Sequence, residues 1–198
     1  MCVALVLVGG SPGTGKTTLA GAVADNLGWA VLSSDRIRKR LAGIPPDADG
    51  RSAFGTGIYT SSWTTQTYAE LLRQAGELLA VGESVILDAS WSSAAARAAA
   101  ADLAREKNAH LVELRCVTSP ELARRRLAAR PPGPSDAGPH IAGHLAASAA
   151  PWPTASVIDT EQGGAAVAAE PGGLRREFDQ IVVQALAAIW PHGAEHVG

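Results

Sequence analysis

The stretch that decides the fold is GGSPGTGKTT, residues 9–18. It follows the apolar run Val3–Val8, which is typical of a strand buried on both faces of a parallel sheet. After it, apolar residues recur at helical spacing as far as Leu27, and Gly28 provides a stop. The sequence therefore predicts a buried strand, a glycine-rich turn and a helix in direct succession.

Residues 10–17 match the phosphate-binding pattern G-x-x-x-x-G-K-[ST], with the strand and helix that this pattern requires on either side. Backbone N–H groups in such a loop point inward around phosphates at the positive end of a helix. We expect Lys16 to reach the β- and γ-phosphates of ATP or GTP, and the Thr17 hydroxyl to ligate Mg²⁺. Thr18 either contacts the α-phosphate or only helps to cap the helix. The predicted nucleotide-binding residues are Gly10, Ser11, Pro12, Gly13, Thr14, Gly15, Lys16, Thr17 and Thr18.

Strand and helix patterns alternate along the rest of the chain. Further strands are expected at Ala30–Ser34, Ser84–Asp88, His110–Val117 and Ser156–Asp159. Helices are expected at Gly15–Leu27, Asp35–Leu41, Thr64–Val81, Ser93–Lys107, Pro120–Arg130 and Leu174–Trp190. The alternation predicts an α/β fold with a mainly parallel sheet covered on both faces. Gly43–Ser62 and Pro131–Pro153 show no regular period, and we expect the first to be a loop or insertion over the site.

Length and composition limit the classes of protein to consider. The 198 residues suit a single domain spanning 1–198. Seventeen Lys and Arg against 19 Asp and Glu give a net charge of −2, which does not favour nucleic acid or an anionic membrane as a partner. The apolar N-terminus lacks the basic segment of a signal peptide, and we expect a cytoplasmic protein. Cys2 and Cys116 lie in apolar runs, as buried thiols do.

A second group of polar residues follows the second predicted strand. Asp35 and Arg38 are three residues apart, a spacing that places both on one face of a helix. At the carboxyl edge of a parallel sheet they would face the crevice of the phosphate loop. Asp35 could then accept the proton of an acceptor hydroxyl, and Arg38 could hold the acceptor or the transferred phosphoryl group. The alternative is an Asp that caps the helix, followed by a solvated run Arg38–Arg40.

Asp88 ends the predicted strand Val85–Asp88. A carboxylate at that place could hold a water molecule of Mg²⁺ or orient the Asp35 region, or it could only cap the next loop. Thr17 and Asp88 are therefore the predicted metal site.

Arginines gather late in the helix that begins at Pro120. Arg126 and Arg130 are four residues apart and share a face, so both could point at phosphates when a lid of about residues 120–153 closes. The alternative is a basic last turn that compensates the helix dipole.

Several other residues flank the expected crevice. Arg97 could reach the acceptor pocket or be exposed, and residues 160–164 could form one wall of an adenine site. Trp63, Trp91 and Trp152 could line an acceptor pocket or simply pack.

These motifs, in this order, resemble the P-loop kinases of the AAA-family ATPase-like type. The group includes polynucleotide 5′-hydroxyl kinase, gluconate-type kinases, chloramphenicol phosphotransferase and zeta-toxin kinases. The resemblance rests on GGSPGTGKTT, SSDRIRK, VILDAS, and ARRRLAAR followed by Ser135-Asp136-Ala137, and it covers roughly Val3 to Thr160. The order is also similar to a kinase module fused to an aminoglycoside-phosphotransferase-like domain in some actinobacterial proteins.

The resemblance implies a five-stranded sheet in the order 2-3-1-4-5 and an arginine-rich lid. It also implies that Lys16, Thr17, Asp35, Arg38, Arg126 and Arg130 carry phosphate binding, base and acceptor roles. The expected activity is transfer of the γ-phosphate of ATP, with Mg²⁺, to a hydroxyl of a small molecule. Two alternatives stay open at this point: a polynucleotide 5′-hydroxyl kinase, and a regulatory module that binds a nucleotide and a partner. The sequence gives neither the acceptor nor the oligomeric state.

Overall fold

One five-stranded sheet forms the centre of the molecule, and every neighbouring pair of its strands is parallel. A computed structural model describes residues 3–45, 59–129, 149–161 and 183–189. The strands are β1 (Ala4–Gly9), β2 (Ala30–Ser33), β3 (Val85–Asp88), β4 (His110–Val117) and β5 (Ser156–Asp159). Their order is β2-β3-β1-β4-β5, which confirms the predicted order.

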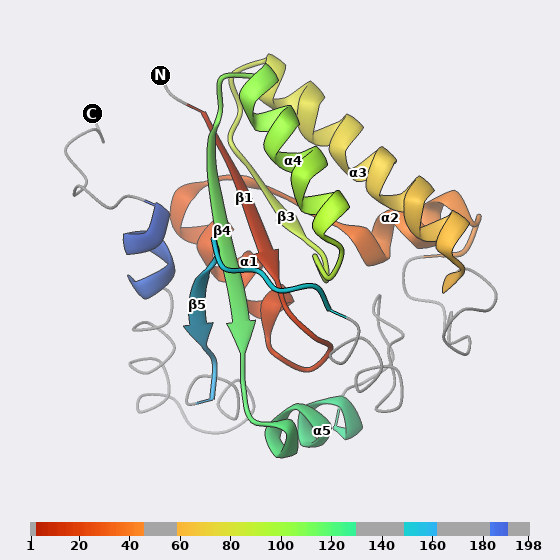
Figure 1. Cartoon of the computed structure of the whole chain (residues 1–198), viewed down its shortest axis with the longest axis vertical. Coiled ribbons are helices and arrows are strands. Elements are labelled where there is room, and N and C mark those ends of the chain that lie inside the picture. The colour runs from red at the N-terminus through yellow and green to blue at the C-terminus, as the bar shows by residue number, and fades with distance from the viewer. Residues whose placement is uncertain (1–2, 46–58, 130–148, 162–182, 190–198) are drawn as a thin grey trace.

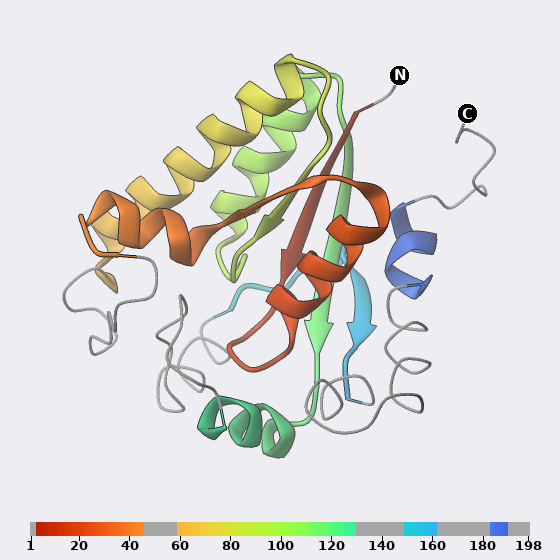
Figure 2. The ribbon, with the colours of Figure 1, turned by 180° about the vertical axis from the view of Figure 1, so that it is seen from behind.

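Helices cover both faces of the sheet (Figures 1 and 2). The helices are α1 (Lys16–Leu27), α2 (Ser34–Leu41), α3 (Ser61–Ala80), α4 (Ala94–Glu106) and α5 (Pro120–Ala128), and residues 183–189 are also helical. In Figure 1, α3 and α4 lie in front of the sheet, and α1 lies behind it. α5 lies below the sheet, beyond the carboxyl end of β4.

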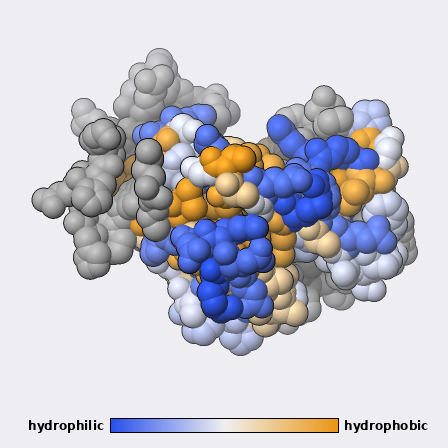
Figure 3. Space-filling view, turned by 90° about the horizontal axis from the view of Figure 1, so that it is seen from above, coloured by the Kyte–Doolittle hydropathy of each residue, from blue (hydrophilic) through white to orange (hydrophobic). Residues whose placement is uncertain are grey.

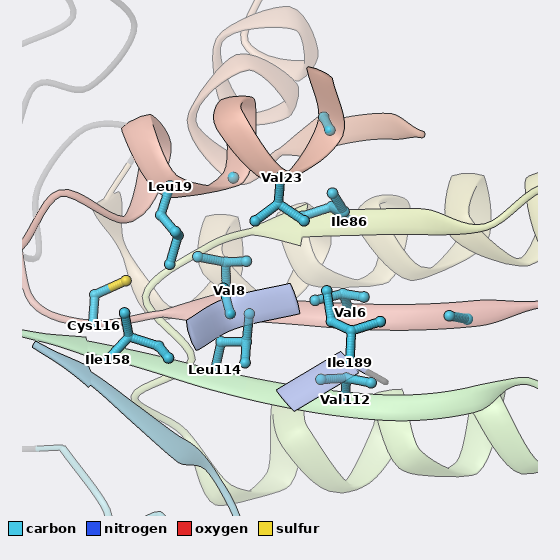
Figure 4. Close-up of a cluster of buried hydrophobic side chains, with 14 residues drawn as sticks. Val6, Val8, Leu19, Val23, Ile86, Val112, Leu114, Cys116, Ile158 and Ile189 are labelled. Atoms are coloured by element: carbon cyan, nitrogen blue, oxygen red, sulfur yellow. The ribbon is translucent and has the colours of Figure 1, made fainter. Parts of the chain in front are cut away.

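The central strand β1 has all six residues buried, because it contributes side chains to two cores. Val6 and Val8 pack with Leu19 and Val23 of α1, and Ile189 packs against the same cluster (Figure 4). On the other face, Leu5 and Leu7 pack with residues of α3 and α4. The unbroken apolar run at the N-terminus is thus explained by burial on both sides.

Capping residues set the starts of two long helices. Thr60 accepts a hydrogen bond from Trp63 N at 3.4 Å, so α3 begins at Ser61, three residues before the predicted start. Ser93 caps α4 in the same way through Ala96 N. α5 ends at Ala128, and Arg130 lies outside the described residues.

Parts of three predicted segments also lie outside the described residues: most of the irregular segments Gly43–Ser62 and Pro131–Pro153, and the first half of the helix Leu174–Trp190. Among the helices that the structure describes, none is long and apolar enough to cross a membrane. Figure 3 shows the molecule from above, where hydrophilic and hydrophobic residues are intermixed on the described surface.

Candidate active site

All five strands point their carboxyl ends to the same edge of the sheet, where the turn after β1 also lies (Figure 1). In such sheets the crevice outside this edge is where ligands bind. The predicted site residues Lys16, Asp35 and Asp88 follow or end three neighbouring strands, β1, β2 and β3.

The turn between β1 and α1, residues 10–15, is the phosphate loop. Gly10 and Gly13 have φ of 139° and 84°, backbone angles that side chains other than glycine rarely adopt. A Cβ at Gly13 would lie 2.6 Å from the main-chain oxygen of Ala123 in α5. The loop therefore packs directly against α5, and its path depends on glycine at this position.

Inside the phosphate loop, the Thr14 hydroxyl donates to the main-chain oxygen of Ser11 at 2.8 Å. Lys16 is half-buried at the start of α1, and Thr17 and Thr18 are exposed in its first turn. The N–H groups of a first helical turn have no partner within the helix, so this end can bind an anion. This loop, with its lysine at the helix start, fits a nucleotide's phosphates.

Asp88 is buried, with 3% of its surface exposed, and it ends β3 opposite Val8 of β1 and Ser33 of β2. Ala89 N donates to the main-chain oxygen of Val8 at 3.2 Å, which holds the end of β3 against the strand that carries the phosphate loop. A carboxylate and a threonine hydroxyl are hard oxygen ligands of the kind Mg²⁺ prefers. Asp88 and Thr17 would thus suit the metal ion of a bound nucleotide.

Asp35 and Arg38 lie on α2, which begins directly after β2. Asp35 is half-buried in the first turn, and Arg38 is buried with 6% of its surface exposed. Arg38 Nη1 donates to Thr64 Oγ1 of α3 at 3.4 Å, and its guanidinium lies 4.9 Å from the ring centroid of Tyr59. Because Lys39 is also buried and only Arg40 is exposed, the alternative of a solvated Arg38–Arg40 run is wrong for its first two residues.

Tyr68 of α3 and the turn after β3 form a hydrogen-bonded group that the sequence did not indicate. Tyr68 Oη lies 3.1 Å from Ser90 Oγ and accepts a hydrogen bond from Trp91 N at 3.1 Å. Gly10 N of the phosphate loop donates to the main-chain oxygen of Ser90 at 3.3 Å. Burial raises the pKa of Tyr68, and Arg38 and Asp35 are near enough to influence it in opposite directions. Helix α3 is thus tied to the phosphate loop through Ser90.

Arg126 of α5 lies beside the phosphate loop. Its Nη1 donates to the main-chain oxygen of Gly13 at 3.3 Å and to Thr160 Oγ1 at 3.2 Å, and its Nη2 donates to the main-chain oxygen of Thr160 at 2.6 Å. Desolvation lowers the pKa of Arg126, while Glu161 and Asp159 oppose this change. Thr160 Oγ1 in turn lies 2.7 Å from the main-chain oxygen of Thr14, to which it donates. The contacts of Arg126 seen here are with the loop backbone, and its role toward phosphates stays a prediction.

Arg97 of α4 was expected either to reach the acceptor pocket or to be exposed, and the expectation that it is exposed is wrong. It is 7% exposed and donates to the main-chain oxygens of Trp91 and Pro151, each at 2.7 Å. Its guanidinium also lies over the ring of Trp152, 5.2 Å from the centroid. Arg97 therefore joins the turn after β3 to the segment that leads into β5.

Trp91 and Trp152 pack in the core on the α3–α4 face and also line the cavity beside the phosphate loop, so both sequence interpretations stay open for them. The Trp152 ring lies so close to Gly9 that a Cβ there would be 2.3 Å from Cζ3. Beneath the phosphate loop, burial raises the pKa of the Cys116 thiol to about 12, in agreement with the expected buried thiol. Cys2 lies outside the described residues.

A cavity of about 470 Å³ opens between the phosphate loop, the turn after β3 and α5. Its lining includes Gly10, Ser11 and Pro12 of the loop. Ser90 and Ser92 line it from the turn after β3, and residues 115–118 at the end of β4, α5 and residues 149–152 also line it. This volume is within the range of small-molecule sites.

Comparison with known proteins agrees with this geometry. The chain is 42% identical over 158 residues to an uncharacterized protein of Mycobacterium tuberculosis and to one of Mycobacterium bovis. The match covers 80% of this chain but only 32% of each relative.

Solved structures with the same fold include three proteins that are named as kinases. A sugar kinase from Janibacter sp. has a TM-score of 0.57 at 22% identity, over 94% of both chains. A gluconokinase from Sinorhizobium meliloti has a TM-score of 0.56 at 20% identity, over 94% of this chain and 91% of that one. Shikimate kinase from Acinetobacter baumannii has a TM-score of 0.53 at 16% identity, over 95% of both chains. These likenesses show the P-loop kinase fold.

The family model described as an AAA domain matches residues 5–147, a span that holds the phosphate loop, Asp35 and Asp88. With its phosphate loop and its parallel sheet in the order β2-β3-β1-β4-β5, the chain belongs to this AAA domain family.

Proposed function

We propose that this chain is an ATP-dependent phosphotransferase that moves the γ-phosphate of ATP to a hydroxyl group of a small molecule. The observation that carries the proposal is the place of Asp35 relative to the phosphate loop. Neighbouring strands lie about 4.8 Å apart, so the ends of β1 and β2 are about 10 Å apart across β3. A phosphoryl group and an attacking hydroxyl fit in a gap of that size.

Each group at this edge suits one part of the reaction. The loop N–H groups and Lys16 would bind the β- and γ-phosphates, and Thr17 with Asp88 would hold the Mg²⁺ ion. Mg²⁺ supplies positive charge that neutralises the phosphate oxygens. Arg38 is fixed by Thr64 and Tyr59, so its guanidinium would orient the acceptor without a further loss of side-chain freedom.

Asp35 is proposed as the general base. The acceptor oxygen forms a bond to the γ-phosphorus, the bond from that phosphorus to the β–γ bridging oxygen breaks, and ADP leaves. The hydroxyl proton passes to the Asp35 carboxylate. The kinases that share the fold, named for sugar, gluconate and shikimate, support a small-molecule acceptor.

The test is ADP release by the pure chain in the presence of a panel of hydroxyl compounds, with the Asp35→Asn variant beside the wild type. Loss of a general base lowers the rate between about 100- and 10,000-fold. Asp25→Asn, an exposed change in α1, is the matched control and should retain full turnover. If no compound raises ADP release, the activity is wrong, and if Asp35→Asn keeps its rate, the base assignment is wrong.

A short oligonucleotide in the same panel distinguishes the proposed activity from the alternative, a polynucleotide 5′-hydroxyl kinase. Transfer to that oligonucleotide with steep salt dependence, and to no small molecule, would replace the proposed acceptor class.

A further inference from the structure

Arg115 carries a positive charge that no described residue balances. It lies near the end of β4, beside Gly9 of β1, and is half-buried. Its guanidinium makes no hydrogen bond or ion pair with any described residue, and its Nε is buried. Glu113 shares its face of the strand two residues earlier but forms no ion pair with it. A half-buried charge without a counter-charge is unfavourable, so an anion bound beside Arg115 would stabilise the folded chain.

Arg115 lines the cavity of about 470 Å³ beside the phosphate loop. The described residues of the lining include a second arginine, Arg124, and no Asp or Glu. Arg124 is exposed and already pairs with Glu121, which lies 2.8 Å from its Nη2. The described lining therefore has an excess of positive charge, and Arg115 is its source.

The hydrogen-bonding groups of this lining also favour an anion. Thr118 Oγ1 and Trp152 Nε1 are buried without a partner, although Trp152 is only 6% exposed, and both atoms can donate. Several main-chain oxygens of the lining already accept hydrogen bonds from the protein, among them those of Ser90, Trp91, Val117 and Pro151. Spare donors beside a positive charge suit a carboxylate or phosphate better than a neutral or cationic group.

The rest of the lining is apolar and includes Pro12, Leu127 and the ring of Trp152. An inorganic ion at Arg115 would leave these side chains in contact with water. A ligand with an apolar body would bury them, and this burial favours its binding.

We propose that this cavity is a second binding site, for a small organic anion whose acidic group pairs with Arg115 and whose apolar body lies against Leu127 and Trp152. The described lining includes none of the residues proposed for phosphate transfer: Lys16, Asp35, Arg38 and Asp88. The inference thus goes beyond the proposed function and does not depend on it.

The experiment measures binding of phenyl phosphate by calorimetry to the chain saturated with ADP and Mg²⁺. Inorganic phosphate and benzyl alcohol should bind more weakly, because each lacks one of the two parts of phenyl phosphate. Arg115→Met keeps a long side chain without the charge and should weaken binding of phenyl phosphate about 10-fold or more. Arg115→Lys keeps the charge and should retain most of the affinity.

Two controls separate this cavity from other sites. Arg105→Ala removes an exposed positive charge from α4, and this variant should bind phenyl phosphate as the wild type does. Lys16→Ala, measured without nucleotide, should also bind phenyl phosphate, because Lys16 is not among the lining residues.

The ligand-free Arg115→Met variant should unfold at a temperature no lower than the wild type, since the arginine has no described partner to lose. A lower Tm would contradict the unbalanced charge. The second site is also overturned if phenyl phosphate does not bind at millimolar concentration, if Arg115→Met binds it as tightly as the wild type, or if Lys16→Ala does not bind it. Equal affinity for phenyl phosphate and either comparison ligand would overturn the assigned ligand class.

Discussion

Arg126 and Thr160 form a hydrogen-bonded pair beside the phosphate loop, in which Arg126 Nη2 donates to the main-chain oxygen of Thr160 at 2.6 Å. The two side chains then reach consecutive loop residues, Arg126 the main-chain oxygen of Gly13 and Thr160 that of Thr14. The backbone of the loop is thereby fixed at two consecutive residues, by α5 and by the segment that follows β5.

Substitution of Arg126 by Ala should weaken nucleotide binding without removing it. Hydrogen bonds from a charged donor contribute about 1.5–3 kcal/mol, so we expect the Kd for ATP to rise by at least about 10-fold. Calorimetric titration with ATP measures this change. Arg125→Ala, an exposed neighbour in the same turn, is the control. Equal Kd values for the two variants would contradict a role of the Arg126–Thr160 pair in ATP binding.

Thr160→Val tests the second residue of this pair with little change in side-chain volume. The variant removes the hydroxyl that lies between Arg126 and Thr14 and leaves a buried carbonyl without its donor. We expect a loss of stability of about 1–3 kcal/mol, measured by urea unfolding, together with weaker ATP binding. Stability and affinity both equal to those of the wild type would show that the hydroxyl is dispensable.

Two glycine-to-alanine changes should have opposite effects. At Gly13 the added Cβ would meet the main chain of α5 at 2.6 Å, so we expect loss of ATP binding and a lower Tm. At Gly21, inside α1, the added Cβ meets no atom within 4 Å, and the change should stabilise the helix by about 0.5–1 kcal/mol. Thermal unfolding with and without ATP compares them, and a Gly13→Ala variant that binds ATP normally would refute the described packing of α5 on the loop.

Arg97→Ala should destabilise the chain by about 3 kcal/mol or more, because two buried main-chain oxygens lose a charged donor. Urea unfolding measures this effect. Arg105→Ala, on the same helix, removes only an exposed ion pair with Asp102 and should change stability by less than about 1 kcal/mol. A similar effect of both changes would mean that the Arg97 contacts do not hold in solution.

The stability of the folded chain at acidic pH should depend on Glu70. Hydrogen bonds from Arg73 and Gln74 lower its pKa to about 2. This carboxylate stabilises the folded state above its ordinary pKa near 4.5, and the contribution is lost as the pH falls from there toward 2. Glu70→Gln should therefore lower the Tm at neutral pH. In this variant the Tm should also fall less than in the wild type as the pH is lowered from 4.5 to about 2. A Tm profile parallel to that of the wild type would disprove the role of Glu70.

The sequence was sufficient to predict the sheet and the phosphate loop because both depend on local patterns. A buried strand needs an unbroken apolar run, and the loop needs glycine and lysine at fixed spacing, so each can be recognised within ten residues. The strand order came from the resemblance, and the parallel pairings confirm it.

Other features depend on contacts between distant residues and have no local signal. Tyr68 and Ser90 are 22 residues apart, and Arg97 and Pro151 are 54 apart. Arg126 could be named as a candidate from its own helix, but its partner Thr160 is 34 residues further along the chain. Helical spacing can show which face a side chain occupies, but it cannot show what packs against that face.

The packing of Trp152 on Gly9 and of Ala123 on Gly13 has a consequence for how such proteins can diversify. The Gly9 contact is made by the Trp152 ring and the Gly13 contact by the main chain of α5, so parts of the chain 143 and 110 residues further along each touch the phosphate turn or the strand that leads into it. A substitution at either glycine would therefore disturb the turn and a distant segment together, and the two glycines can change only if those segments change with them.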